Sequence, residues 1–296
     1  MTVDEIQTKI EELKFIEGAE VFNIGYSLLN RPITAIHIGS YSGPQILIQG
    51  AIHAREYITS LLLIELVKFT STQRFSGGFY FVPLMNPDGV ALVLEGKQSV
   101  RCDVLKQYLT NINGGSEDFS LWKANANAVD LNVNFNADWG EGRQNVFCPA
   151  PANFVGYYPE SEREVRTLIN FAQNIKPSMT ISYHSRGEVI YYGFTGQTEA
   201  QLERDLLIAS NIAEVTGYTV ERSFGSVAGF KDWTTRYLLV PAVTIEVGSS
   251  EMQHPIGEKY LAEIFAKNQY VPVVAMNSIQ TILSNKRGNR FWRNTF

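Results

Sequence analysis

The chain has 296 residues, of which 45% are hydrophobic, so it is long enough to bury a large core. Its 25 Lys and Arg residues against 30 Asp and Glu residues give a formal charge of −5, without the basic excess that a nucleic-acid surface needs. These values exclude a disordered, collagen-like or coiled-coil chain and argue against nucleic acid and anionic membranes as partners.

The N-terminal segment, residues 1–15, carries several acidic side chains and lacks the apolar stretch of a secretory signal peptide. We expect a short amphipathic helix here and a cytoplasmic location, with release by cell lysis as an alternative. The longest apolar stretches, such as Ile58–Val67, fall short of the ~20 apolar residues that a membrane span requires. The two cysteines, Cys102 and Cys148, fit a reducing compartment, and the sequence leaves open whether they pair.

Apolar runs typical of strands alternate with helical patterns along the rest of the chain. The predicted strands are Ile33–Ile38, Gln45–Gln49, Phe79–Leu84, Met179–Tyr183, Val189–Tyr192 and Ala242–Val247. The predicted helices are Thr59–Thr70, Ser161–Asn174, Glu199–Thr216 and Gly257–Leu283. Two long surface loops are expected at Tyr108–Asp118 and Asn136–Tyr158. Because no repeat or linker divides the chain, this order predicts one α/β domain, residues 1–296, with a largely parallel or mixed sheet covered by helices on both faces.

Three potential metal ligands follow predicted strands. His53 and Glu56 lie three positions apart at a strand-to-helix turn, and His184 comes directly after Met179–Tyr183. Ligand sites in α/β sheets lie beyond the carboxyl ends of strands, so these side chains are expected to converge. Zinc accepts nitrogen and oxygen ligands, and a catalytic site uses three protein ligands and leaves a fourth position for water. The His-x-x-Glu spacing alone is weak evidence, since it arises by chance and a strand-end histidine is often structural.

A third strand end supplies a carboxylate that fits the role of general base. Glu246 lies in the apolar run Ala242–Val247, where a carboxylate carries a large desolvation cost unless it has a partner or a task. A metal polarises water, but another group must accept the proton, and Glu246 is placed to do so. The alternative is a half-buried glutamate that forms a salt bridge with an arginine.

These residues belong to an ordered set of motifs that resembles the zinc carboxypeptidases related to carboxypeptidase A. The motifs are His53-Ala54-Arg55-Glu56, Asn86-Pro87-Asp88-Gly89, Val129-Asp130-Leu131-Asn132, Pro159-Glu160-Ser161-Glu162, His184-Ser185 and Thr244-Ile245-Glu246. The resemblance covers most of the chain. It implies a mixed, twisted eight-stranded sheet with helices on both sides, a zinc ion held by His53, Glu56 and His184, and Glu246 as the base.

Two departures from the family pattern bear on the substrate. In the family, an arginine shortly after a tryptophan helps to polarise the scissile carbonyl. Lys123 is the residue at that position here. It either stabilises the oxyanion as a point charge or is a solvated surface lysine. An Asn-Arg pair fixes the substrate's C-terminal carboxylate in the family, whereas this chain has Asn132-Val133. Valine cannot form the bidentate pair with a carboxylate, so trimming of ordinary protein C-termini is in doubt.

Three further stretches are Trp122-Lys123-Ala124-Asn125, Asp130-Leu131-Asn132-Val133-Asn134-Phe135 and His184-Ser185-Arg186-Gly187-Glu188. They are similar to those of the bacterial branch that cleaves γ-D-glutamyl–diamino acid bonds in peptidoglycan stem peptides. Within that resemblance, Arg186 replaces the missing arginine by binding a carboxylate of diaminopimelate or D-Glu, or else pairs with Glu188 for structure. Arg55 lines a subsite or faces solvent. His37 and His254 have no carboxylate at ligand spacing, so both are expected to be packed or surface histidines.

Three functions therefore compete. The first is a zinc peptidase acting on the γ-D-glutamyl–diamino acid bond of murein peptides. The second is a metallocarboxypeptidase with altered recognition of the C-terminus. The third is a catalytically silent peptide-binding relative, against which the intact ligand set and base argue. The oligomeric state is left open by the sequence.

Overall fold

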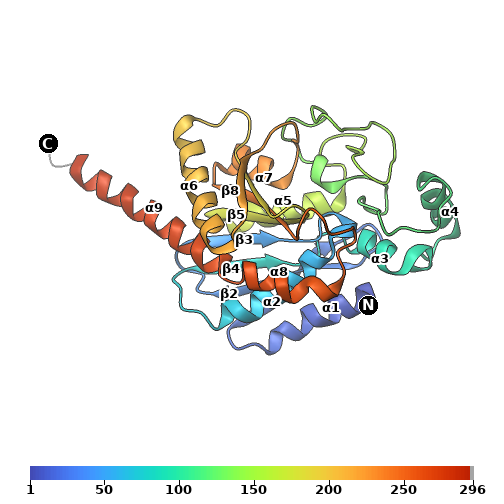
Figure 1. Cartoon of the computed structure of the whole chain (residues 1–296), viewed down its shortest axis with the longest axis horizontal. Helices are drawn as coiled ribbons and strands as arrows, with labels where there is room; N and C mark the ends of the chain where they lie inside the picture. The colour runs from blue at the N-terminus through green and yellow to red at the C-terminus, as the bar shows by residue number, and fades with distance from the viewer. Residues whose placement is uncertain (294–296) are drawn as a thin grey trace.

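An eight-stranded mixed sheet forms the centre of the molecule (Figure 1). The structure is a computed structural model that describes the backbone of residues 1–293 and the side chains of residues 1–285. The strands are β1 (Ala19–Tyr26), β2 (Pro32–Gly39), β3 (Gln45–Gln49), β4 (Gly78–Val82), β5 (Met179–Ser185), β6 (Val189–Tyr192), β7 (Thr219–Arg222) and β8 (Ala242–Val247). Their order in the sheet is β1-β2-β4-β3-β5-β8-β6-β7. The predicted mixed α/β sheet is confirmed.

Helices cover both faces of this sheet (Figure 1). One face packs against α1 (Val3–Glu12), α2 (Ile58–Ser71), α6 (Glu199–Thr216), α8 (Leu261–Asn268) and α9 (Val271–Arg293). The other face packs against α5 (Arg163–Ile175) and α7 (Phe230–Trp233). Side chains of β3 alternate between the two cores, with Ile46 and Ile48 in the first and Leu47 in the second. Both faces of β3 are therefore buried, which explains its continuous apolar sequence.

The direction of the central strands decides where the candidate site lies. Strand β5 runs parallel to both β3 and β8, so their carboxyl ends lie at one edge of the sheet. His53 follows β3 at this edge. His184 in β5 and Glu246 in β8 are direct partners in the register of the two strands. The expected convergence of strand-end residues thus follows from the sheet topology.

Several elements differ from the expectations. The predicted loop Tyr108–Asp118 is wrong in its first part, because α4 (Asp103–Ile112) continues through it and buries Leu109. Helix α3 (Pro87–Glu95) was not predicted, although it begins with an Asn86 N-cap and a proline in its first turn.

The predicted helix Gly257–Leu283 is divided in two. Helix α8 ends at Asn268 and α9 begins at Val271. The break falls before Pro272, which has no amide hydrogen to donate back to the preceding turn. Toward its C-terminal end α9 projects away from the rest of the molecule (Figure 1). Among the helices of the described part, neither α9 nor any other is sufficiently long and apolar to span a membrane.

Candidate metal centre

The turn after β3 brings His53 and Glu56 to one side of the backbone. His53 has an extended conformation and precedes the 3₁₀ turn Ala54–Glu56, which is closed by a hydrogen bond from the Glu56 amide to the His53 carbonyl (3.1 Å). Residues three apart on a 3₁₀ turn are aligned, so both side chains point in the same direction. His184 reaches them from the neighbouring strand β5.

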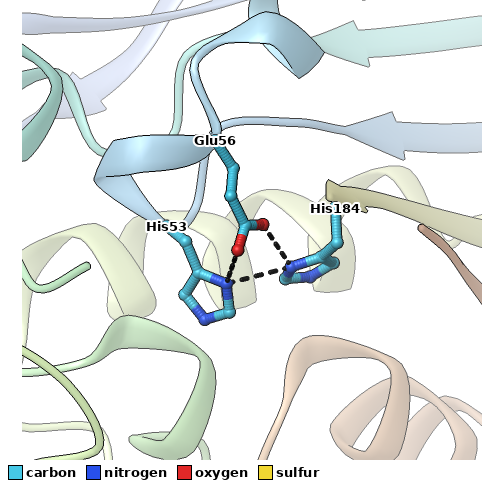
Figure 2. A group of neighbouring side chains, drawn as sticks. All are labelled: His53, Glu56 and His184. Carbon is cyan, nitrogen blue, oxygen red and sulfur yellow. Dashed lines mark hydrogen bonds and ion pairs between the residues drawn. The ribbon is translucent and has the colours of Figure 1, made fainter. Parts of the chain in front are cut away.

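The three side chains converge on a common point (Figure 2). The Nδ1 atom of His53 lies 3.1 Å from Glu56 Oε1 and 3.1 Å from His184 Nδ1, and Glu56 Oε2 lies 3.0 Å from His184 Nδ1. The three residues are buried, and one ligand atom from each lies within 4.8 Å of the others. Two imidazole nitrogens and a carboxylate oxygen, desolvated together, are a donor set that suits zinc. This arrangement fits the predicted metal group.

A buried aspartate contacts the ring nitrogen of His53 that does not face the other two ligands. The Nε2 atom of His53 lies 3.1 Å from Asp130 Oδ1, and with Nε2 donating this hydrogen bond the Nδ1 lone pair faces the other two ligands. Burial opposes ionisation of Asp130, but the charges of Lys123 and His53 outweigh it and hold the pKa of this carboxyl well below its usual range. Lys123 Nζ lies 2.9 Å from Asp130 Oδ2. Lys123 is thus ion-paired in the site and is not a solvated surface lysine.

Glu246 lies beside the three ligands in a desolvated position. Burial, followed by the nearby charge of Glu56, raises the pKa of the Glu246 carboxyl to about 7. Its Oε2 atom is buried and has no hydrogen-bond partner among the described residues. The alternative of a salt bridge to an arginine does not occur in the described part of the chain. A buried carboxylate with one uncommitted oxygen is chemically suited to accept a proton.

A cavity of about 480 Å³ opens from this group. Of the predicted site residues, His53, Lys123, Asn132, His184 and Glu246 line it. Three further charged residues in its wall, which the sequence interpretation missed, are Arg143, Lys231 and Asp232. They lie in an irregular loop and in α7, so no local pattern in the sequence marked them.

Arg55 and Arg186 are not among the described residues that line this cavity. The Nε atom of each is buried without a hydrogen-bond partner in the described part of the chain. The alternative pairing of Arg186 with Glu188 is not found, because Glu188 pairs with Lys267. The roles of both arginines stay predictions.

The two remaining histidines differ in position. His37 is buried in β2, stacks on Tyr41 and lies 3.3 Å from Gln45 Oε1, as expected for a packed residue. His254 is near the metal group, and burial lowers the pKa of its imidazole to about 4. The negative charge of Glu56 opposes this decrease, whereas the positive charges of Arg55 and Arg186 add to it. The sequence did not indicate this proximity, since His254 follows the site strand through an irregular loop. Cys102 and Cys148 are exposed free thiols.

A family model described as zinc carboxypeptidase matches residues 12–256, which is most of the chain. The chain belongs to this family. It is therefore a metallopeptidase, and the His-Glu-His group fits the zinc that the family uses. The resemblance inferred from the ordered motifs is confirmed.

Relatives within the family include enzymes with different names. The chain is 31% identical over 274 residues to gamma-D-glutamyl-L-diamino acid endopeptidase 1 of Lysinibacillus sphaericus. The alignment covers 87% of this chain and 67% of that protein. It is 26% identical over 239 residues to carboxypeptidase A1 of Sus scrofa, which covers 71% of this chain and 53% of that protein.

Solved structures confirm the fold. Bovine thrombin-activatable fibrinolysis inhibitor is similar with a TM-score of 0.77 and 21% identity, covering 95% of this chain and 97% of that one. The murein-tripeptide amidase of Escherichia coli O157 is similar with a TM-score of 0.55 and 22% identity, covering 88% of this chain and 91% of that one.

Proposed function

We propose that this metallopeptidase hydrolyses the γ-D-glutamyl–diamino acid bond of peptidoglycan stem peptides. Its 31% identity to a gamma-D-glutamyl-L-diamino acid endopeptidase supports the proposal, as does the likeness to a murein-tripeptide amidase. The proposed zinc ligands are His53, Glu56 and His184, and the proposed general base is Glu246.

The observation that carries this proposal is the charged lining of the cavity. The buried side chains of Lys231 and Asp232 both contribute to the wall and pair with one another, and Lys231 Nζ also donates to the Gly193 carbonyl (2.6 Å). A wall that contains such an ion pair is polar, and it suits a side chain that carries both an amino and a carboxylate group better than an apolar one. Diaminopimelate has such a side chain. A cavity for an ordinary apolar or aromatic terminal residue would instead be lined mainly by apolar groups.

The protein groups divide the chemistry among them. Zinc, when bound, supplies a Lewis acid and lowers the pKa of water at the site. The Oε2 atom of Glu246, which is buried and has no hydrogen-bond partner among the described residues, accepts the proton of the attacking water and returns it to the leaving amine. Lys123 stabilises the oxyanion as a point charge, and Asp130 orients both Lys123 and His53.

Three polar residues are proposed to bind the substrate. Asn132 lines the cavity, and its Oδ1 atom accepts a hydrogen bond from the Phe230 amide (3.2 Å), which leaves its amide group for the substrate. Arg186 and Arg55 lie near the metal group, since the charges of both act on His254 together with those of Glu56 and His53, and their buried Nε atoms have no partner among the described residues. We assign them to carboxylates of the substrate, with Arg186 on a carboxylate of D-Glu or of the diamino acid.

Mass analysis of products from a peptide panel tests this function. The panel contains L-Ala-γ-D-Glu-diaminopimelate, the same peptide with an α-linked D-Glu, and a hippuryl-type carboxypeptidase substrate. We expect zinc-dependent release of L-Ala-D-Glu from the first peptide alone, and loss of that product with Glu246→Gln. Preference for the hippuryl-type substrate would contradict the proposal and identify a metallocarboxypeptidase with altered recognition of the C-terminus.

A further inference from the structure

The cationic side chains in the cavity wall are not equally available to a substrate. Among the described lining residues, Lys123, Arg143 and Lys231 carry a permanent positive charge. Lys123 is held by Asp130, and Lys231 is held by Asp232. Arg143 forms no salt bridge within the described part of the chain. Among these three cations, Arg143 is therefore the one that no carboxylate of the described residues neutralises.

Arg143 is held by an aromatic ring. Its guanidinium carbon lies 4.2 Å from the centre of the Phe224 ring, and its backbone amide donates to the Gly225 carbonyl (3.1 Å). Gly225 has a φ of +80°, and a Cβ atom there would lie 2.9 Å from Arg143 Cδ, so glycine permits the close approach of the two loops. A guanidinium stacked on a ring keeps its in-plane N–H donors free, because the ring covers only one face.

The chemistry of these free donors selects the ligand. A guanidinium presents a planar pair of N–H groups that matches a carboxylate in a bidentate geometry. Cleavage at the metal group leaves a residue whose new amine and α-carboxylate are joined to one carbon atom. That carboxylate is charged only if the residue ends the peptide, since a further residue converts it into a neutral amide. A free arginine in the same cavity thus distinguishes a terminal residue from an internal one.

We propose that Arg143, supported by Phe224, binds the free α-carboxylate of the leaving diamino acid and directs the enzyme to peptides that end at this residue. The identity of the diamino acid rests on the proposed function, which places it in the cavity. Arg143 is then a specificity-determining residue, and the enzyme acts on tripeptides in preference to longer stem peptides.

Steady-state kinetics on a matched set of peptides test this role. The substrates are L-Ala-γ-D-Glu-diaminopimelate, its α-carboxamide, and the tetrapeptide extended by D-Ala. We expect the unmodified enzyme to prefer the free acid over the amide and the tetrapeptide by ~10–100-fold in kcat/KM, mainly through KM. In Arg143→Ala the ratio of acid to amide should shrink to about threefold or less, and Arg143→Lys, which keeps the charge without the planar fork, should give an intermediate ratio.

A matched control removes the same charge far from the cavity. Arg74 is exposed in the loop before β4, at the sheet edge opposite the candidate site. Arg74→Ala should keep the ratio of the unmodified enzyme. Zinc content and thermal midpoint are measured for every variant, and we expect Arg143→Ala to match the unmodified enzyme in both, since its side chain is exposed.

The outcomes separate this inference from the proposed function. An unchanged ratio of acid to amide in Arg143→Ala overturns the role of Arg143, while cleavage of the γ-D-glutamyl bond by the same protein upholds the proposed function. If the unmodified enzyme cleaves no murein peptide, the proposed function fails. In that case the acid and amide forms of the peptide that the enzyme does cleave are compared. The role of Arg143 is supported if Arg143→Ala reduces the ratio of acid to amide in kcat/KM, and it is contradicted if this ratio is unchanged.

Discussion

Replacing Asp130 with asparagine tests how the support behind His53 sets the affinity for zinc. Asp130 is fully buried, and its two oxygens lie 3.1 Å from His53 Nε2 and 2.9 Å from Lys123 Nζ. Asparagine has nearly the same shape but is neutral and has one oxygen, so one of the two partners must face an NH₂ group. The Asp130→Asn variant therefore holds His53 less firmly and leaves Lys123 without its counter-ion.

The expected size of the effect follows from these contacts. Loss of the partner of a ligating histidine costs about 10–100-fold in metal affinity. This corresponds to about 1.4–2.7 kcal/mol of binding free energy. Stability should fall as well, because breaking a buried ion pair costs ~3–5 kcal/mol, and we expect the lower end since Lys123 keeps 17% of its side chain exposed.

Competition with a chromophoric zinc chelator measures the affinity, and denaturant unfolding of the metal-free protein measures the stability. Asp88→Asn is a matched control, because Asp88 is also fully buried and its Oδ1 atom lies 2.8 Å from Arg31 Nη1. Both variants should lose stability, but only Asp130→Asn should lose zinc affinity. Zinc binding by Asp130→Asn within about threefold of the unmodified protein, or an equal loss in the control, would refute the reasoning.

Four further predictions concern the remaining groups. His184→Ala should lose most of its bound metal, because one of three converging ligands is removed, and stoichiometric, tightly held zinc in this variant would show that His184 is not a ligand. Glu246→Gln should keep its zinc while kcat falls by ~10²–10⁴-fold, and near-normal turnover would assign the base elsewhere. Arg186→Ala should reduce kcat/KM on L-Ala-γ-D-Glu-diaminopimelate by ~10–100-fold, and an unchanged value contradicts its role in carboxylate binding. Glu164 is buried, and burial raises the pKa of its carboxyl to about 7 from 4.5, so the native state favours the protonated form. Its contribution to the free energy of unfolding is fully present below pH 4.5 and is lost as the pH rises through 7, a change of roughly 3 kcal/mol. Glu164→Gln should therefore flatten the decrease of stability between these pH values in urea titrations, and an identical pH profile for the two proteins would contradict the raised pKa.

The metal group could be predicted from the sequence because its parts are local or follow from strand direction. His53 and Glu56 belong to one turn, whose spacing fixes their relation to each other. His184 and Glu246 end apolar runs that read as buried parallel strands, and parallel strands place their carboxyl ends at one edge. Helix α3 also carries a local signal in the sequence, the Asn86 cap followed by Pro87.

Only the tertiary structure decided which residues surround the metal group and which of their charges are paired with an opposite charge. The sequence shows Lys123, Asp130 and Arg143 as three charged residues, and only packing reveals that the first two form an ion pair while the third stacks on Phe224. The position of His254 depends in the same way on an irregular loop. Loops have no period that fixes the direction of a side chain, so contacts between residues distant in sequence are set by the packing of the whole chain. The sequence alone therefore determined the metal chemistry, and the folded structure determined the surroundings from which substrate recognition is inferred.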